Sequence, residues 1–212
     1  LHVRSRRQRQ MCIRDRIRLH QHPLPGINKK ETRRLRRKLQ AVFQNSAASL
    51  NPKLNIIDSV MEPLDVSKQD IPSFLKDFQG SRRLTAERLF SMVGLPPSLL
   101  DRYPHELSGG QLQRALIARA ISTHPSLIIF DEPTASLDVT SQAKILDLLK
   151  DLQDDMGLSY LFISHDLAAV HFMSHRIMVM KDGQIADQFK KEELFSAERH
   201  PYAKKLLQVF ES

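Results

Sequence analysis

The stretch "SLIIFDEP", Ser126 to Pro133, decides the fold class of this sequence. Its β-branched and aromatic residues, bounded by Pro125 and Pro133, are typical of a short strand that is buried on both faces, as in a parallel sheet. A second run of the same kind, "SYLFISH", spans Ser159 to His165. The two runs predict two neighbouring strands of one parallel sheet.

The segment between these strands, "DVTSQAKILDLLKDLQDDMG", is predicted to be a helix. Asp138 is suited to cap its start and Gly157 to end it. Apolar residues mark one face at helical spacing: Ile145, Leu148, Leu149 and Leu152. Strand, helix and strand make a βαβ unit with the usual right-handed crossover, so the predicted fold class is α/β.

The sequence also predicts a hairpin and helices on either side of this unit. "HRIMVMKDGQIADQF" is expected to turn at Asp182-Gly183, and a terminal helical segment follows it. In "ETRRLRRKLQAVF" the spacing of Leu35 and Leu39 predicts a helix. Its basic face is interpreted as solvated and not as an electrostatic footprint for nucleic acid, because no aromatic or Asn/Gln readout residues are interleaved with it.

Residues 53–122 have mostly helical patterning and are expected to form a helical insert. Prolines interrupt this patterning, because a proline lacks the N–H that a helix interior uses. Breaks are therefore expected at Pro63, at Pro72 and at the pair Pro96-Pro97.

The composition indicates one domain of a cytosolic protein. The 212 residues, 41% apolar and 26% charged, are enough for one sizeable core. No apolar run approaches the roughly eighteen residues of a membrane span, and the arginine-rich start lacks the apolar stretch of a secretory signal. Cys12 is the single cysteine, which excludes an intrachain disulfide. The net charge is +8, but six arginines and one aspartate in residues 1–16 contribute +5 of it, so we expect no nucleic-acid partner.

The motif "LSGGQ", Leu107 to Gln111, opens another predicted helix. Ser108 is suited to be its N-cap, and Gly109 and Gly110 leave backbone N–H groups open to an anion, which the helix dipole also favours. A phosphate group would fit there. A helix start of this composition is also common as a simple cap, so the motif alone leaves both interpretations open.

Acidic side chains follow the first predicted strand at the point where the chain leaves the sheet. Of Asp131 and Glu132, one carboxylate can hold Mg²⁺ while the other, pointing to the opposite side, orients or deprotonates a water. "ISHD" ends the second strand at the same edge, so His165 could reach a transferring phosphate. The alternatives are two acids in a solvated turn and a histidine with a structural role.

Four motifs in this order resemble the nucleotide-binding subunit of an ABC transporter. "VFQNS" matches that family's Q-loop, with Gln44, and "LSGGQLQRA" matches its signature motif. "LIIFDEPTASLD" matches Walker B and the D-loop, with Asp138, and "FISHD" matches the H-loop, with His165. The resemblance covers about Ile17 to the C-terminus and implies a P-loop NTPase fold with a helical subdomain.

The resemblance also implies a role for each matched residue, with ATP and Mg²⁺ bound. Asp131 would bind Mg²⁺, Glu132 would be the general base towards the attacking water, and His165 would contact the γ-phosphate. Gln44 would sense the metal and link the site to the membrane subunits. The remaining matched residues would act across a head-to-tail dimer with a second ATPase subunit: Ser108, Gly109, Gly110, Gln111 and Asp138.

Two further matches, "VFQNSAASLNP" and "HPYAKKLL", resemble the subgroup that serves importers of dipeptides, oligopeptides and nickel. That subgroup implies permease subunits as partners, an extracytoplasmic solute-binding protein as an indirect one, and a peripheral position on the cytoplasmic face of the membrane. The rival from another class is an ABC-type ATPase that acts on DNA or the ribosome, which would need coiled-coil arms or a second cassette. A non-catalytic binding module is a third reading, which the Asp131-Glu132 pair with His165 argues against.

The sequence departs from the family's pattern because it contains no G-x-x-x-x-G-K-[ST] loop, and the aromatic residue that usually stacks on adenine is missing as well. Backbone N–H groups and the lysine of that loop would cradle the β- and γ-phosphates. We therefore expect the chain to lack the N-terminal part of the ATPase fold, including the Walker A strand and loop. We also expect that it does not hydrolyse ATP by itself.

The stretch "RRQRQMCIRDR", residues 6–16, resembles the translation of a transposase-based sequencing-library adapter. Residues 1–16 are therefore expected to be non-native. The expected division of the remainder is a core-lobe remnant at 17–43, a helical subdomain at 44–122, an ATPase core at 123–190 and a C-terminal helical segment at 191–212.

Overall fold

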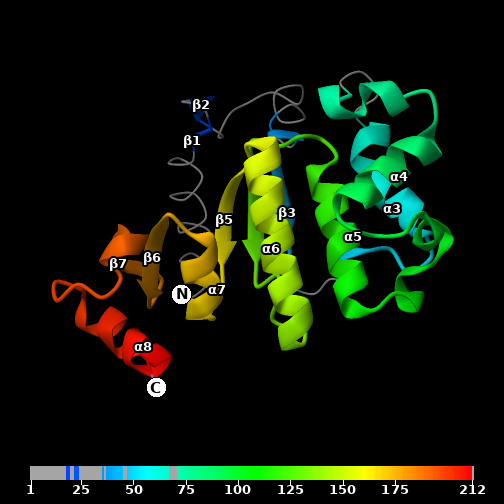
Figure 1. Ribbon diagram of the computed structural model, residues 1–212. Coiled ribbons are helices and arrows are strands. Elements are labelled where there is room, and N and C mark those ends of the chain that lie inside the picture. Colours follow the sequence, from blue (N-terminus) through cyan, green and yellow to red (C-terminus); the bar gives the residue numbers. More distant parts are fainter. Residues whose placement is uncertain are drawn as a thin grey trace, which may run out of the picture.

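Figure 1 shows the computed structural model, in which residues 18–19, 22–23, 35, 37–44, 47–66 and 71–211 are described. A parallel three-stranded sheet lies at its centre, in the order β3 (Leu39–Val42), β4 (Leu127–Asp131), β5 (Ser159–Ile163). The short strands β1 (Arg18–Leu19) and β2 (His22–Pro23) form a separate antiparallel pair. The α/β class and both strands predicted around "LIIFD" and "SYLFI" are confirmed.

The helix α6 (Val139–Met156) connects β4 to β5 as the sequence predicts. The Asp138 side chain accepts a hydrogen bond of 2.9 Å from the Ser141 N–H at the start of α6. At the other end Gly157 has φ +63°, the left-handed conformation that glycine adopts without steric cost. The face that packs on the core includes Ile145 and Leu149, both fully buried. The βαβ unit is thus confirmed with both of its caps.

The strand β3 was not predicted. The sequence predicts a helix that continues through Leu39, and this is wrong, because residues 39–42 pair in parallel with residues 127–130 of β4. Residues 35, 37 and 38 are helical, while residues 31–34 and 36 of the predicted helix lie outside the described residues. A run as short as "LQAV" carries no clear period, so pairing with β4 decides its structure.

The helical insert is confirmed as a set of helices between β3 and β4. Its α-helices are α3 (Ile56–Val66), α4 (Arg82–Met92) and α5 (Gly109–Ile121). Its 3₁₀ turns are η1 (Ala47–Ser49), η2 (Ser73–Phe78), η3 (Pro97–Asp101) and η4 (Pro104–Glu106). Pro72 and Pro96 precede η2 and η3, as expected of breaks. The break expected at Pro63 is wrong: Pro63 lies inside α3, whose buried residues keep the helix packed.

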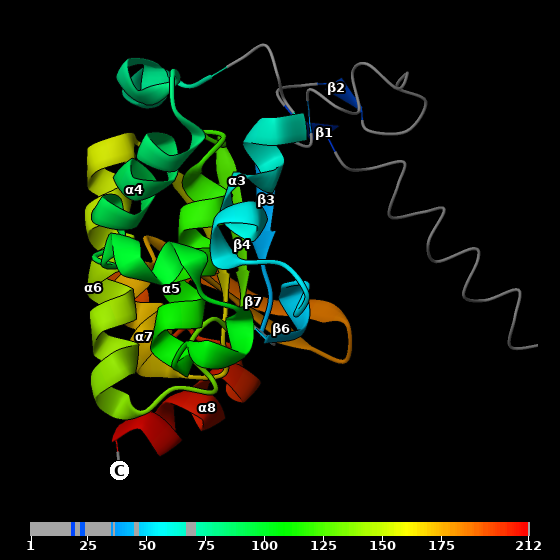
Figure 2. The ribbon, with the colours of Figure 1, turned by 90° about the vertical axis from the view of Figure 1, so that its right-hand side faces the viewer.

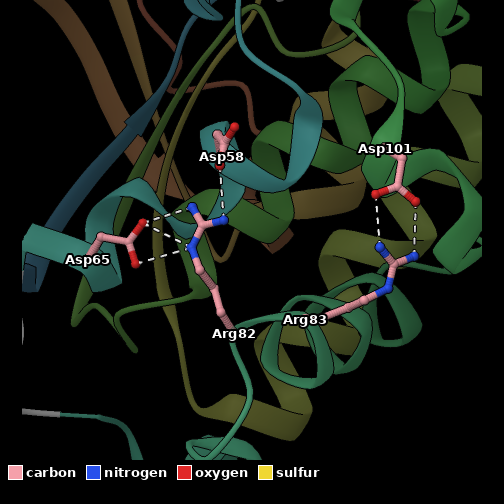
Figure 3. Close-up of polar contacts among 5 residues, drawn as sticks. All are labelled: Asp58, Asp65, Arg82, Arg83 and Asp101. Carbon is pink, nitrogen blue, oxygen red and sulfur yellow. Dashed lines mark hydrogen bonds and ion pairs between the residues drawn. The ribbon is translucent and has the colours of Figure 1, made fainter.

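Two arginines at the start of α4 tie the insert together, as Figure 3 shows. Arg82 donates to Asp58 at 2.9 Å and to Asp65 at 2.9 Å, and both carboxylates belong to α3. Arg83 forms two parallel bonds, of 2.8 and 3.0 Å, with Asp101 at the end of η3. Each pair is exposed and contributes little by itself, so the pairs orient these elements more than they stabilise them.

The chain ends in a smaller unit beside the sheet. It comprises α7 (Leu167–Met173), β6 (Arg176–Lys181), β7 (Gln184–Lys190), η5 (Lys191–Glu193) and α8 (Pro201–Glu211). The predicted hairpin is confirmed: β6 and β7 pair antiparallel and turn at Asp182-Gly183, which have φ +50° and +77°. Of the predicted terminal helical segment, η5 and α8 are helical, whereas residues 194–200 between them are not. None of the described helices is long and apolar enough to cross a membrane.

One main core joins the sheet to the helices. Figure 2 shows α5, α6 and α7 on the same side of the sheet. Phe130 of β4, Phe90 of α4 and Ile117 of α5 are fully buried within the same cluster, so the helical insert and the sheet share it. Since side chains of the sheet and the insert interlock, the core fixes the position of α5 relative to the strand ends.

Candidate functional site at the carboxyl edge of the sheet

The parallel register places the predicted residues at one edge of the sheet. Val42 of β3 pairs with Phe130 of β4, which pairs with Phe162 of β5. The chain therefore leaves all three strands at the same level, and Gln44 and Glu132 lie one or two residues further along. Ligands of open α/β sheets bind at this edge.

Glu132 and His165 are in direct contact. The carboxylate oxygen Oε1 of Glu132 accepts hydrogen bonds from the backbone N–H of His165 at 3.1 Å and from its ring Nδ1 at 2.8 Å. The Glu132 side chain is 19% exposed, while that of His165 is 78% exposed. The imidazole ring is therefore largely in solvent, whereas the carboxylate that it contacts is mostly buried. Oε2 of Glu132 takes part in neither bond.

The backbone of Glu132 is in the left-handed region, with φ +51°. This conformation is uncommon for a residue with a side chain and costs of order 1 kcal/mol or more, so the surroundings must hold it. The Glu132 N–H donates to the carbonyl of Ile163 at 2.9 Å, which continues the pairing of β4 with β5 by one residue. The same bend turns the carboxylate towards His165.

The contact changes the acid–base behaviour of His165. The hydrogen bond and the charge of Glu132 raise the pKa of His165 above its ordinary value, and the charge of Asp166 adds to this, against a lowering by desolvation. A protonated imidazole donates from both ring nitrogens. With Nδ1 directed at Glu132, the cation has Nε2 left to donate to an anion.

The motif "LSGGQ" starts α5 with a reciprocal capping box. The Ser108 hydroxyl accepts from the Gln111 N–H at 3.3 Å, and the Gln111 side chain accepts from the Ser108 N–H at 2.9 Å. A Cβ built on Gly109 would lie 3.4 Å from the Leu137 side chain, and one on Gly110 would lie 3.7 Å from the Ser141 hydroxyl. The glycines thus let α5 begin close against the segment that starts α6.

The start of α5 and the contact of Glu132 with His165 are separate features. In the part of the chain that the structure describes, no hydrogen bond or ion pair joins Ser108 or Gln111 to either of them. Asp138 belongs with the first group, since it caps α6 beside Gly110. The hydroxyl of Ser141, followed by its N–H, lowers the pKa of Asp138, so this cap is a carboxylate.

Magnesium chemistry is compatible with the donors at the edge. Asp131 ends β4 and Gln44 follows β3, so one carboxylate and one amide oxygen come from paired strands. The ion takes oxygen ligands, and one or two carboxylates with phosphates and waters are enough. Within the described ranges there is no group of three or more His, Cys, Asp or Glu side chains that would hold a metal alone. The donor set thus fits a metal that arrives with a phosphate ligand.

The sequence did not reveal the partner of Asp166. Its Oδ2 accepts a hydrogen bond of 2.5 Å from the side-chain amide of Gln142 on α6. These residues are 24 positions apart, so no local pattern connects them. The only signal was that Gln142 lies in the first turn of a helix that begins at the edge of the sheet.

The fold and this edge define an α/β domain of the P-loop NTPase class. The family model described as ABC transporter matches residues 6–135, and the chain belongs to this family. The chain is also similar to two solved forms of the dimeric ATP-binding cassette MJ0796. One, a post-hydrolysis state bound to ADP and phosphate, has a TM-score of 0.68 and 30% identity over 82% of this chain and 72% of that one. The other has a TM-score of 0.65 and 32% identity over 78% and 68%.

Curated relatives are similar over most of this chain. A protein of Brucella abortus (strain 2308), named "Putative peptide import ATP-binding protein", is 48% identical over 173 residues, 82% of this chain and 50% of the relative. The glutathione import ATP-binding protein GsiA of Pectobacterium atrosepticum is 44% identical over 177 residues, 82% of this chain and 27% of the relative. The chain thus spans half of the first relative and less of the second.

Proposed function

We propose that this chain is part of the ATP-hydrolysing subunit of an ABC importer, with peptides as its class of substrate. The observation that carries the proposal is the contact of Glu132 with His165 where β4 and β5 end. Relatives named for peptide and glutathione import support the direction of transport and the substrate class. They also favour transport over an ATPase that acts on DNA or the ribosome.

In the proposed reaction Glu132 takes a proton from the attacking water. Its Oε1 is held by two bonds from His165, so Oε2 can face the water. The raised pKa of His165 favours its protonated form, which would donate from Nε2 to a γ-phosphate oxygen. Asp131 and Gln44 would hold Mg²⁺, which neutralises charge that develops on the phosphates. Because Glu132 and His165 are set in place before substrate arrives, little reorganisation is needed in the transition state.

We further propose that the start of α5 serves a partner subunit. Ser108, Gly109, Gly110 and Gln111, with Asp138 beside them, would complete the ATP site of a second ATPase subunit in a head-to-tail dimer. Their separation from Glu132 and His165 supports this, as does the dimeric state named for the MJ0796 cassette. Permease subunits and, indirectly, a solute-binding protein are the other proposed partners, at the cytoplasmic face of the membrane.

The proposal is tested in a chimera, because the sequence contains no G-x-x-x-x-G-K-[ST] loop. Residues 1–38 are replaced by the corresponding N-terminal part of the 48% identical Brucella relative. The chimera should hydrolyse ATP when Mg²⁺ is present, whereas the unaltered chain should not. Glu132→Gln should lower kcat at least about a hundredfold, since it removes the base.

Glu192→Gln is the matched control, because Glu192 is an exposed residue of η5. It should leave turnover unchanged. A chimera without activity, or one that Glu132→Gln does not slow, would contradict the proposed reaction.

The origin of residues 6–16 is a separate proposal. We propose that the segment derives from adapter DNA and that 17–43, 44–122, 123–190 and 191–212 are the native parts. The family match begins at residue 6 and therefore covers this stretch, which is an observation against the proposal and makes a direct test necessary. Long-read sequencing of the source locus tests the proposal: we expect no in-frame codons for "RRQRQMCIRDR" there, and their presence would refute it.

A further inference from the structure

Asp166 is the point where three elements meet. Its Oδ1 accepts from the N–H groups of Ala168 and Ala169, at 2.9 and 3.3 Å, and so caps α7. Its Oδ2 accepts from the side chain of Gln142 in the first turn of α6. Its own backbone continues directly from His165, which lies two residues beyond the end of β5. Whatever holds Asp166 therefore also limits the movement of His165.

The bond from Gln142 is well defined chemically. In this bond the side-chain Nε2 of Gln142 donates and the carboxyl oxygen Oδ2 of Asp166 accepts. The distance is 2.5 Å, and the bond is partly buried, which makes it stronger than an exposed one. A short and partly buried bond of this kind restrains both side chains.

The same turn of α6 touches the start of α5. Ser141, next to Gln142, lies under Gly110, and its N–H and hydroxyl hold Asp138. On one side this turn therefore contacts the segment proposed to serve a partner subunit. On the other side it contacts Asp166 and, through it, His165.

We propose that Gln142 is a positioning residue that locks the loop of His165 to the first turn of α6. The backbone N–H of His165 stays directed at Glu132 because Asp166 cannot withdraw from α6. A movement of the start of α6, such as a partner subunit would cause, is then transmitted to the contact of His165 with Glu132. The inference rests on the proposed function only for the roles that it gives to Glu132 and His165.

Hydrogen–deuterium exchange of the full chain tests the positioning. In Gln142→Glu the amide becomes a carboxylate that repels Asp166, and in Gln142→Met the donor is lost without an added charge. In both variants the backbone N–H of His165 should exchange about tenfold faster than in the unaltered chain, because the hydrogen bond from this N–H to Glu132 opens more often. Gln142→Lys keeps an N–H donor of similar reach and should restore the slow exchange.

The control is Gln153→Glu, the same substitution near the far end of α6, where the side chain accepts from Lys150. It should leave the His165 amide unchanged. Exchange in peptides that cover residues 145–152 reports global unfolding. If Gln142→Glu proves to be unfolded, the proposal is decided by comparing the His165 exchange rates of Gln142→Met and Gln142→Lys. The proposal is overturned if Gln142→Met exchanges His165 at the unaltered rate, or if Gln142→Lys exchanges it as fast as Gln142→Met.

The active chimera provides the second measurement. Gln142→Met should lower kcat about tenfold and change KM much less, since the nucleotide keeps its other contacts while Glu132 and His165 are misplaced. Normal exchange at His165 in Gln142→Met would refute the positioning and leave the proposed function intact. Full activity of Glu132→Gln would refute the proposed function and leave the exchange result standing.

Discussion

At the scale of single residues, Glu132 combines several unusual properties at one position. Its backbone has φ +51°, its N–H extends the pairing of β4 with β5, and its carboxylate holds His165. The sequence placed both residues at one edge, because parallel strands end together. It did not indicate their contact, since that depends on a backbone conformation that glutamate rarely adopts.

We expect Glu132→Gln to lower the pKa of His165 towards the ordinary value of histidine. The hydrogen bond and charge of Glu132 are the largest causes that raise this pKa. The pair contributes to folding at pH values below the ordinary histidine pKa, and the contribution is lost as pH rises through the raised pKa. An NMR titration of the histidines, with His165→Asn to assign the signal, measures the shift. If the His165 titration midpoint is the same in Glu132→Gln, Glu132 is not the cause of the raised pKa. The control Glu192→Gln should leave this midpoint unchanged.

At the scale of elements, the local patterns were predictable and the long-range contacts were not. Ser108 and Asp138 cap α5 and α6 as predicted, because a cap bonds to an N–H only three residues away. Arg119 of α5 instead pairs with Glu62 of α3 at 2.5 Å, across 57 positions of sequence. Only the folded packing of α3 against α5 brings these two charges together.

Ser108→Ala should destabilise the active chimera by about 1 kcal/mol, because the N–H of Gln111 loses its acceptor. Ser81→Ala is the matched control, since Ser81 caps α4 through the N–H of Leu84 at 3.3 Å and should cost about the same. Urea unfolding measures both. If the start of α5 serves a partner, only Ser108→Ala should also lower ATP turnover. Equal turnover in the two variants would contradict that role.

At the scale of the whole molecule, the α/β class followed from one βαβ unit whose two strands are buried runs. The strand β3 escaped prediction, because four residues show no period and only their pairing with β4 makes them a strand. The resemblance in four motifs, however, singled out Gln44, which lies two residues beyond β3, without any prediction of that strand. The motifs thus drew attention to a residue beside a strand that periodicity missed.

Strands β5 and β6, which belong to different sheets, both expose apolar side chains. Among the described strands β5 pairs only with β4, and its Leu161 and Ile163 are 38% and 44% exposed. On β6, Met178 and Met180 are 50% and 64% exposed. An apolar strand with a free edge is a template for association between molecules.

We therefore expect the unaltered chain to self-associate as its concentration rises, and Leu161→Lys to reduce this, because a charge on an edge strand opposes further pairing. Light scattering over a dilution series measures the effect. Leu84→Lys is the matched control: Leu84 is 51% exposed on α4, away from a strand edge, and the change should have little effect. A monodisperse, cooperatively melting monomer of the unaltered chain would contradict the expectation. An equal reduction of self-association in Leu161→Lys and Leu84→Lys would also contradict it, since net charge and not the edge of β5 would then govern association.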